Sequence, residues 1–217
     1  LISFLKKMGC EIQISGRTIK ISGTNKIYTV SHNVIFDRIE LGTYMIAAAA
    51  TGEKIIFNNI NSSFVKTEIK ILKKMGVKIS VSKKKIVIYK SAKLNRINLV
   101  TKPYPGFPTD LQAQIMVLMS KARGVSKIKE SIFENRFMHV PELKRMGAKI
   151  KIKKNIAEIF GPTNLSGAEV MATDLRASVC LVIAGLIADN RTIINRIYHL
   201  DRGYQNLEKK LKNCNAN

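Results

Sequence analysis

The 217-residue chain contains no tryptophan, and aromatic side chains make up only 6% of it. Proteins that bind single-stranded nucleic acid usually stack bases on aromatic rings, so this scarcity argues against such a surface. Long apolar runs are also missing, because Asp189 and Arg191 end the best one, residues 179–188, well short of a membrane span. The composition therefore predicts a protein without a membrane segment.

Cysteine is scarce as well, and Cys10, Cys180 and Cys214 show no paired spacing. This excludes a disulfide framework and predicts reduced thiols in a cytoplasmic protein. Residues 1–9 lack the charged start and apolar core of a secretory signal. The chain begins without Met inside a predicted helix, which favours a piece of a longer protein.

Acidic residues are few: 15 Asp and Glu stand against 37 Lys and Arg, for a net charge of +22. Such a charge fits a polyanion partner. The lysines are spread along the chain, however, and the only run, residues 83–85, lies at a predicted hairpin turn. Abundant Lys, Ile and Asn also match AT-rich codons, and small anionic substrates fit the charge equally well. We predict no nucleic-acid partner, with RNA binding as the alternative.

The common catalytic and cofactor motifs are absent. The sequence has no glycine-rich phosphate loop, no Gly-x-Ser-x-Gly elbow and no His-Glu-x-x-His. His139 and His199 have no metal-ligand partners at a repeated spacing, which indicates structural histidines and no metal site.

What the chain does contain is a repeat. The segment Leu-Lys-Lys-Met-Gly at residues 5–9 recurs at 72–76 and, as Leu-Lys-Arg-Met-Gly, at 143–147, with a degenerate copy at 211–215. The Gly, or Asn215 in the last copy, is expected to end a helix in the left-handed conformation. After each Gly the apolar residues alternate with polar ones and then return, which predicts a β-hairpin with one buried face.

Another helix and strand precede each of these segments, so the unit is β-α-β-α-β-β. The first helix of each unit is apolar on all sides and must lie in a core. The predicted fold is α+β, made of repeated β-α-β-α-β-β units with the apolar helices inside and the sheets outside. The predicted copies are residues 34–89, residues 97–160 and a third from about 170, after the tail of an earlier copy at 1–30.

An aspartate opens the first helix of each unit: Asp37, Asp110 and Asp174. Each could cap its helix or present a carboxylate where a ligand binds. Prolines stiffen the entry to Asp110, and Arg176, in the first turn after Asp174, opposes the helix dipole and suggests a nearby anion.

Two arginines, Arg136 and Arg202, lie in equivalent strand-to-helix loops of neighbouring units. They could converge on a phosphate or a carboxylate. The alternative is that each pairs with a local acid, Glu134 or Asp201. Spacing along the chain slightly favours the local pairing.

Four long strings together resemble UDP-N-acetylglucosamine 1-carboxyvinyltransferase, a family of enolpyruvyl transferases. The strings are Pro-Gly-Phe-Pro-Thr-Asp-Leu-Gln-Ala-Gln at 105–114, Phe-Glu-Asn-Arg-Phe-Met-His-Val-Pro-Glu-Leu at 133–143, Ala-Thr-Asp-Leu-Arg-Ala-Ser at 172–178 and Arg-Ile-Tyr-His-Leu-Asp-Arg-Gly-Tyr at 196–204. The resemblance covers essentially the whole chain and is to the C-terminal half of that family. It implies that residues 1–33 end a first enolpyruvyl transferase domain and that residues 34–217 form most of a second.

The resemblance also implies an activity: transfer of the enolpyruvyl group of phosphoenolpyruvate to the 3′-hydroxyl of UDP-N-acetylglucosamine, in peptidoglycan synthesis. It implies Asp110 as base and sugar-nucleotide ligand, and Asp174 as a group that assists proton transfer. Ile132 is expected to line the UDP-N-acetylglucosamine site through its backbone. Arg176 and Arg202 are expected to bind phosphoenolpyruvate, and Arg136 to support closure and the anion. No cofactor and no metal are implied, and we expect a monomer.

The chain departs from the family in three ways that matter. None of its cysteines lies in the family's catalytic-cysteine motif, the N-terminal Lys-Asn pair for substrate binding is missing, and so is the strand that the second domain takes from the chain's start. We therefore expect half of a site and little turnover by this chain alone. A truncated remnant without catalysis is the competing interpretation.

Overall fold

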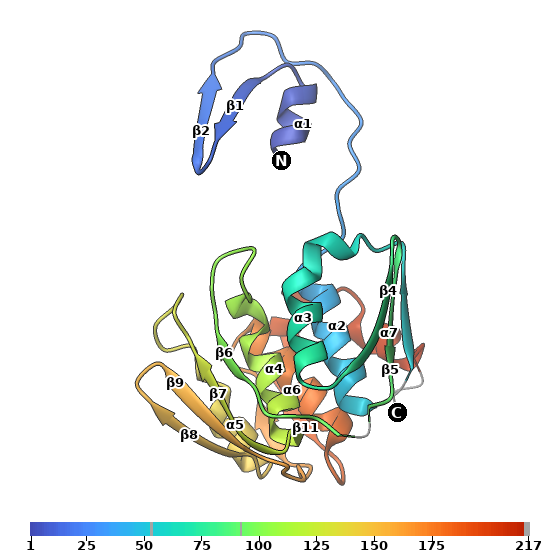
Figure 1. Cartoon of the computed structure of the whole chain (residues 1–217), viewed down its shortest axis with the longest axis vertical. Helices are drawn as coiled ribbons and strands as arrows, with labels where there is room; N and C mark the ends of the chain where they lie inside the picture. Colours follow the sequence, from blue (N-terminus) through green and yellow to red (C-terminus); the bar gives the residue numbers. More distant parts are fainter. Residues whose placement is uncertain (53, 92, 215–217) are drawn as a thin grey trace. The chain divides into compact units, whose positions relative to one another are not determined.

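A computed structural model of the protein describes residues 1–52, 54–91 and 93–214, and the chain divides into two units, Leu1–Phe36 and Asp37–Asn217 (Figure 1). The division falls three residues after the expected domain boundary at residue 33. The first unit consists of helix α1 (Ile2–Lys7) and the antiparallel hairpin of β1 (Glu11–Ser15) and β2 (Thr18–Ser22). It has the shape that the tail of one repeat should have.

The glycines that end the Leu-Lys-Met-Gly helices adopt the expected conformation. Gly9, Gly76 and Gly147 have φ values of +104°, +90° and +94°. In each copy the Gly N–H donates to a carbonyl three residues back, and the next N–H donates to one five residues back. These two bonds satisfy the free carbonyls at a helix end, so this prediction is confirmed. Asn215, predicted to play this part in the last copy, lies outside the described residues.

Three apolar helices form the core of the second unit: α2 (Arg38–Thr51), α4 (Gln112–Lys121) and α6 (Leu175–Ile187) (Figure 1). Nine of the ten residues of α4 are buried. Helices with no polar face avoid water only when neighbours cover them on all sides. Lys121 confirms the close packing, because its Nζ donates to Ala50 O at the end of α2 at 2.8 Å, and burial lowers the pKa of its amine.

The sheets lie around these helices, as predicted (Figure 1). One sheet has the order β3-β5-β4, a second β6-β7-β9-β8 and a third β10-β11. The strands are β3 (Ile55–Asn58), β4 (Lys78–Ser82), β5 (Lys85–Tyr89), β6 (Asn98–Val100), β7 (Gly124–Lys129), β8 (Lys149–Lys153), β9 (Ile156–Gly161), β10 (Glu169–Met171) and β11 (Ile193–Asn195). The shorter helices are η1 (Ser62–Val65), α3 (Lys66–Lys74), η2 (Thr109–Leu111), α5 (Val140–Arg145), η3 (Ile197–Arg202) and α7 (Leu207–Lys212).

The middle copy shows the complete β-α-β-α-β-β order, from β6 to β9. The first copy does not, because residues 23–37 contain no strand, and the prediction of an opening strand near Val34 is wrong. Val34 and Ile35 are 87% and 64% exposed, so this stretch has no buried face that would place it in a sheet. It connects the two units.

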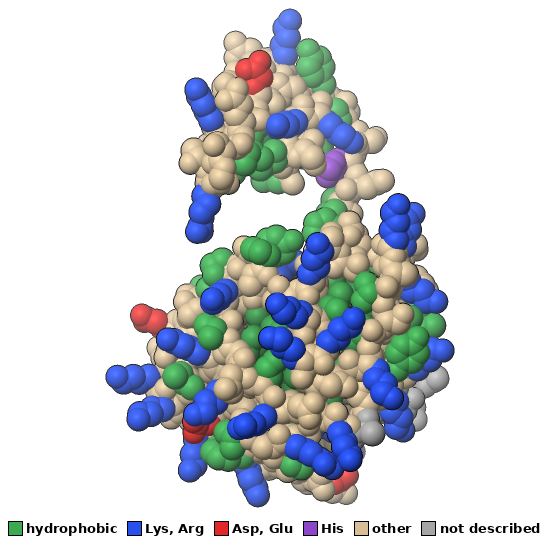
Figure 2. Space-filling model, in the orientation of Figure 1, with side chains coloured by type: hydrophobic (Ala, Val, Ile, Leu, Met, Phe, Trp, Pro, Cys, Tyr) green, Lys and Arg blue, Asp and Glu red, His purple; other side chains and the backbone are tan. Residues whose placement is uncertain are grey.

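Positive side chains are scattered over the surface of the second unit (Figure 2). Within the described ranges, no helix is long and apolar enough to cross a membrane.

Candidate active site

The three helix-opening aspartates have different roles. Asp37 caps α2: its Oδ1 accepts hydrogen bonds from the N–H groups of Ile39 at 2.7 Å and Glu40 at 3.2 Å. Asp174 caps α6 in the same way, with N–H donors from Arg176 at 2.7 Å and Ala177 at 2.9 Å. These bonds satisfy N–H groups that a helix start leaves unpaired. Of the two roles that the sequence left open for Asp37, the structure shows the helix cap.

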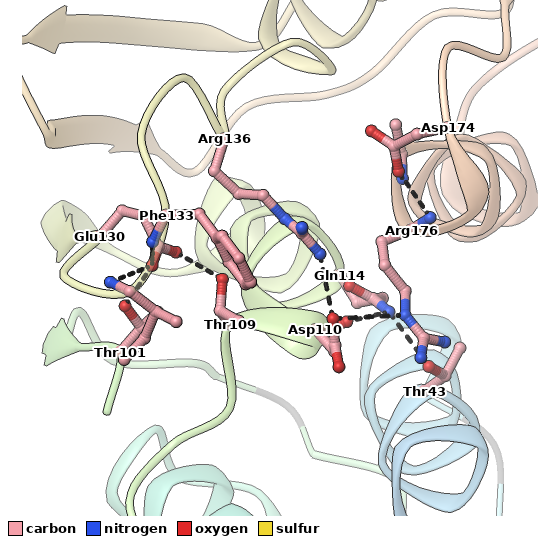
Figure 3. Close-up of polar contacts among 12 residues, drawn as sticks. Thr43, Thr101, Thr109, Asp110, Gln114, Glu130, Phe133, Arg136, Asp174 and Arg176 are labelled. Atoms are coloured by element: carbon pink, nitrogen blue, oxygen red, sulfur yellow. Dashed lines mark hydrogen bonds and ion pairs between the residues drawn. The ribbon is translucent and has the colours of Figure 1, made fainter. Parts of the chain in front are cut away.

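Asp110 does not cap a helix. It lies in η2, and its Oδ1 pairs with Arg136 Nη2 at 3.0 Å and with Arg176 Nε at 3.6 Å (Figure 3). The Asp110 side chain is 40% exposed, so a ligand can reach it. If equivalent positions in the repeated units had equivalent roles, all three opening aspartates would be caps. Asp110 is not a cap, because its carboxylate turns toward two guanidinium groups.

Arg176 is fixed by a buried polar cluster. Its Nη1 donates to the Tyr204 hydroxyl at 3.1 Å, and its guanidinium lies 5.7 Å from the Tyr204 ring centroid. The same hydroxyl lies 3.0 Å from Thr43 Oγ1, and Gln114 Nε2 donates to Thr43 Oγ1 at 3.2 Å. Gln114 Nε2 also donates to the backbone carbonyl of Asp110 at 2.9 Å. Side chains from all three repeat copies thus meet behind Asp110.

Arg136 extends from a loop that borders a pocket of about 720 Å³. Its guanidinium lies 5.2 Å from the ring centroid of Phe133. Ile132 lines the pocket, and Lys154 adds a second positive charge to its wall. Cations and apolar side chains together suit a ligand with both phosphate groups and apolar surface.

The arginine pair that converges is Arg136 with Arg176, and not Arg136 with Arg202. Arg136 pairs with Asp110 rather than with Glu134, so its predicted local pairing is wrong. Arg202 is exposed on the last turn of η3 and forms no side-chain hydrogen bond or ion pair within residues 1–52, 54–91 and 93–214. Its role in binding an anion stays a prediction, as does a role of Asp174 in proton transfer beyond its cap.

Sequence reasoning missed Glu130, Gln114 and Tyr204. Glu130 is 2% exposed, and both of its carboxylate oxygens accept hydrogen bonds next to the site (Figure 3). The available signal for Glu130 was a charged residue, directly after β7, at a position that the alternation along this strand predicts to be buried. For Gln114 and Tyr204 the sequence offered no signal beyond their places in the resembling strings.

His139 is structural, as predicted. It is 2% exposed, its Nε2 lies 3.3 Å from Met116 Sδ, and burial lowers its pKa to about 4. The neutral ring is the form that fits this apolar position.

Acid should therefore destabilise the protein through His139. The folded-state pKa of His139, about 4, lies below the unfolded value of 6.5. The stability that the neutral ring contributes is therefore complete above pH 6.5 and is lost as the pH falls toward 4. By pH 5 it should amount to about 2 kcal/mol. The free energy of unfolding should fall more between pH 7.5 and pH 5 in the wild type than in His139→Met, which does not titrate. Parallel pH profiles for the two proteins would contradict this assignment.

Comparison with known proteins identifies the family of the chain. A family model described as EPSP synthase (3-phosphoshikimate 1-carboxyvinyltransferase) matches residues 1–211. The chain belongs to this enolpyruvyl transferase family. Its predicted family and α+β fold are confirmed.

Two similar curated proteins carry the same enzyme name. The chain is 55% identical over 217 residues to UDP-N-acetylglucosamine 1-carboxyvinyltransferase of Pelagibacter ubique, and 50% identical to UDP-N-acetylglucosamine 1-carboxyvinyltransferase 1 of Caldanaerobacter subterraneus. Each match covers 100% of this chain and 52% of the relative. The chain thus spans about half the length of these relatives.

Solved structures agree on the fold. The enolpyruvyl transferase NikO from Streptomyces tendae matches with a TM-score of 0.90 at 26% identity, over 100% of this chain and 52% of that one. EPSP synthase from Acinetobacter baumannii matches with a TM-score of 0.76 at 19% identity, over 96% of this chain and 52% of that one, which shows a shared fold alone.

Proposed function

We propose that the protein transfers the enolpyruvyl group of phosphoenolpyruvate to the 3′-hydroxyl of UDP-N-acetylglucosamine with release of phosphate. The observation that carries the proposal is the Asp110 carboxylate beside the guanidiniums of Arg136 and Arg176 at the edge of a pocket. The name shared by relatives at 50–55% identity supports this donor and acceptor. By the same inference the protein acts in peptidoglycan synthesis, and so in cell shape and division, as a cytoplasmic monomer.

The chemistry assigns a part to each charge. The sugar hydroxyl must lose a proton as its oxygen adds to C2 of phosphoenolpyruvate, and the Asp110 carboxylate can accept that proton. In the same addition C3 gains a proton, and loss of a C3 proton with departure of phosphate then restores the double bond. Both substrates carry phosphate groups, which Arg136 and Arg176 bind through charge-assisted hydrogen bonds. The same guanidiniums fix the direction of Asp110 before the substrates arrive, which lowers the cost of orienting it.

None of the three cysteines is placed to act in the proposed reaction. Cys180 is fully buried in α6, and burial raises its pKa well above the usual value, so the thiol is inert. Cys10 and Cys214 are free thiols outside the Asp110 cluster. The proposed reaction therefore assigns Asp110 and the arginines to these residues, and the other half of the site to the part of the relatives' length that the match does not cover.

The proposal is tested by complementation. The half of the Pelagibacter ubique relative that lies outside the match is joined ahead of Leu1, and phosphate release from phosphoenolpyruvate is measured with UDP-N-acetylglucosamine present. We expect turnover by this chimera and little by the 217-residue chain. A folded chimera without turnover would support the inactive-remnant interpretation, and full activity of the 217-residue chain would overturn the half-site proposal.

A further inference from the structure

Glu130 is a buried carboxylate without a cation. It is 2% exposed, and within the described part of the chain it forms no ion pair. A buried charge is costly unless hydrogen bonds replace its water. Here four donors do so. Oε1 accepts from Thr101 Oγ1 at 2.8 Å and from the backbone N–H groups of Ile132 at 2.8 Å and Phe133 at 3.3 Å, and Oε2 accepts from Thr109 Oγ1 at 2.9 Å.

The two oxygens bind two different segments of the site (Figure 3). Oε2 binds Thr109, whose next residue is Asp110. Oε1 binds the N–H groups at the start of the loop that carries Arg136. Asp110 and Arg136 form the 3.0 Å ion pair of the proposed active site. One carboxylate therefore fixes the segments at both ends of that pair.

Glu130 is itself fixed at its backbone. Its N–H donates to Asn155 O at 2.8 Å, and Asn155 Nδ2 donates to the Glu130 carbonyl at 2.8 Å. Asn155 lies in the turn between β8 and β9 and lines the same pocket. The carboxylate is thus attached to the sheet, which makes it a rigid reference point for the two loops.

We propose that Glu130 is a positioning residue that sets the Asp110–Arg136 pair through Thr109 on one side and the Ile132 and Phe133 amides on the other. Because Glu130 is 2% exposed, its carboxylate acts through these two segments. Only a carboxylate can accept at both oxygens, because a glutamine would present N–H donors at one end. The effect on substrate binding rests on the proposed function, while the effect on the ion pair does not.

The link through Thr109 can be cut without changing side-chain shape. Thr109→Val is isosteric and removes the hydroxyl, whereas Thr109→Ser keeps the hydroxyl and removes the methyl. Glu130→Gln should lie between the wild type and Thr109→Val, because its carbonyl oxygen can keep the three donors at Oε1 while its amide donates to the Thr109 hydroxyl, which can also accept.

The measurements use the 217-residue chain. Nitrogen-15 NMR follows exchange of the Arg136 guanidinium protons with water, and a titration with UDP-N-acetylglucosamine gives the affinity. Circular dichroism verifies that each variant is folded. We expect Thr109→Val to speed Arg136 exchange and to weaken binding about tenfold, and Thr109→Ser to keep wild-type values.

The outcomes distinguish the positioning role of Glu130 from the proposed function. Unchanged Arg136 exchange in folded Thr109→Val, or a loss in Thr109→Ser equal to that in Thr109→Val, would overturn the positioning role. Absence of UDP-N-acetylglucosamine binding in the wild type would count against the proposed function, and Arg136 exchange would still decide the role of Glu130.

Discussion

Asp110→Asn should lower phosphate release by the complemented enzyme roughly 10³-fold, the middle of the range for loss of a general base. The amide cannot accept the proton from the sugar hydroxyl, although it has nearly the same size. It also loses the charge that pairs with Arg136 and Arg176. Because Asp110 is 40% exposed and caps no helix, the fold should be retained. The assay is steady-state phosphate release at saturating substrate, with circular dichroism to verify folding.

Asp37→Asn is the matched control within the same chain. Asp37 opens the equivalent helix in the preceding repeat, but among the described residues its carboxylate accepts only from N–H groups of its own first turn. Asparagine caps a helix about as well as aspartate, so turnover should stay within about threefold of the wild type. An equal loss of activity in both variants would show that the position in the repeat, and not the contact with the two arginines, decides the role.

Gly161→Ala should destabilise the second unit by about 3 kcal/mol, at the upper end for overpacking. A Cβ at this position would lie 2.3 Å from the carbonyl oxygen of Ala122 and 2.7 Å from that of Ser120. Both atoms belong to the backbone at the end of α4, so neither can move aside as a flexible side chain would. Typical domains are stable by only about 5–15 kcal/mol, so the loss should be large.

The measurement is urea unfolding followed by far-UV circular dichroism, because the chain has no tryptophan to report by fluorescence. Gly23→Ala is the control: a Cβ there meets no atom within 4 Å, and Gly23 does not have a positive φ. Its unfolding midpoint should match that of the wild type. A wild-type midpoint for Gly161→Ala would mean that β9 lies farther from α4 than the structure shows.

Local features of the fold were predictable because they depend on neighbours in sequence. The left-handed glycines at the helix ends and the Asp37 cap involve hydrogen bonds between residues two to five positions apart. The apolar run at residues 179–188 lies mostly in helix α6, Leu175–Ile187, because an uninterrupted apolar stretch between an Asp cap and a polar turn has few alternatives. The opening strand near Val34 failed because strand formation depends on a partner that local sequence does not supply.

For the site, too, local sequence predicted the residues but not their contacts. The strings around Asp110, Arg136 and Arg176 marked them as candidates, and the family match agrees. Which guanidinium reaches which carboxylate was not predictable, because Arg136 is 26 residues from Asp110 and Arg176 lies in another repeat copy. Tyr204 and Thr43, which meet behind the site, are 161 residues apart.

The sequence by itself determined the repeat, the ends of its helices, the burial of α2, α4 and α6, and the family. Each of these follows from periodicity, capping or motif, which act over a few residues or over one string. Only the tertiary structure decided that Asp110, alone among the three opening aspartates, faces two arginines, and that Glu130 connects the segments on either side of that pair. Side-chain direction at a helix mouth depends on charges that other repeats bring close, and an aspartate at the start of a helix does not by itself show whether those charges are present.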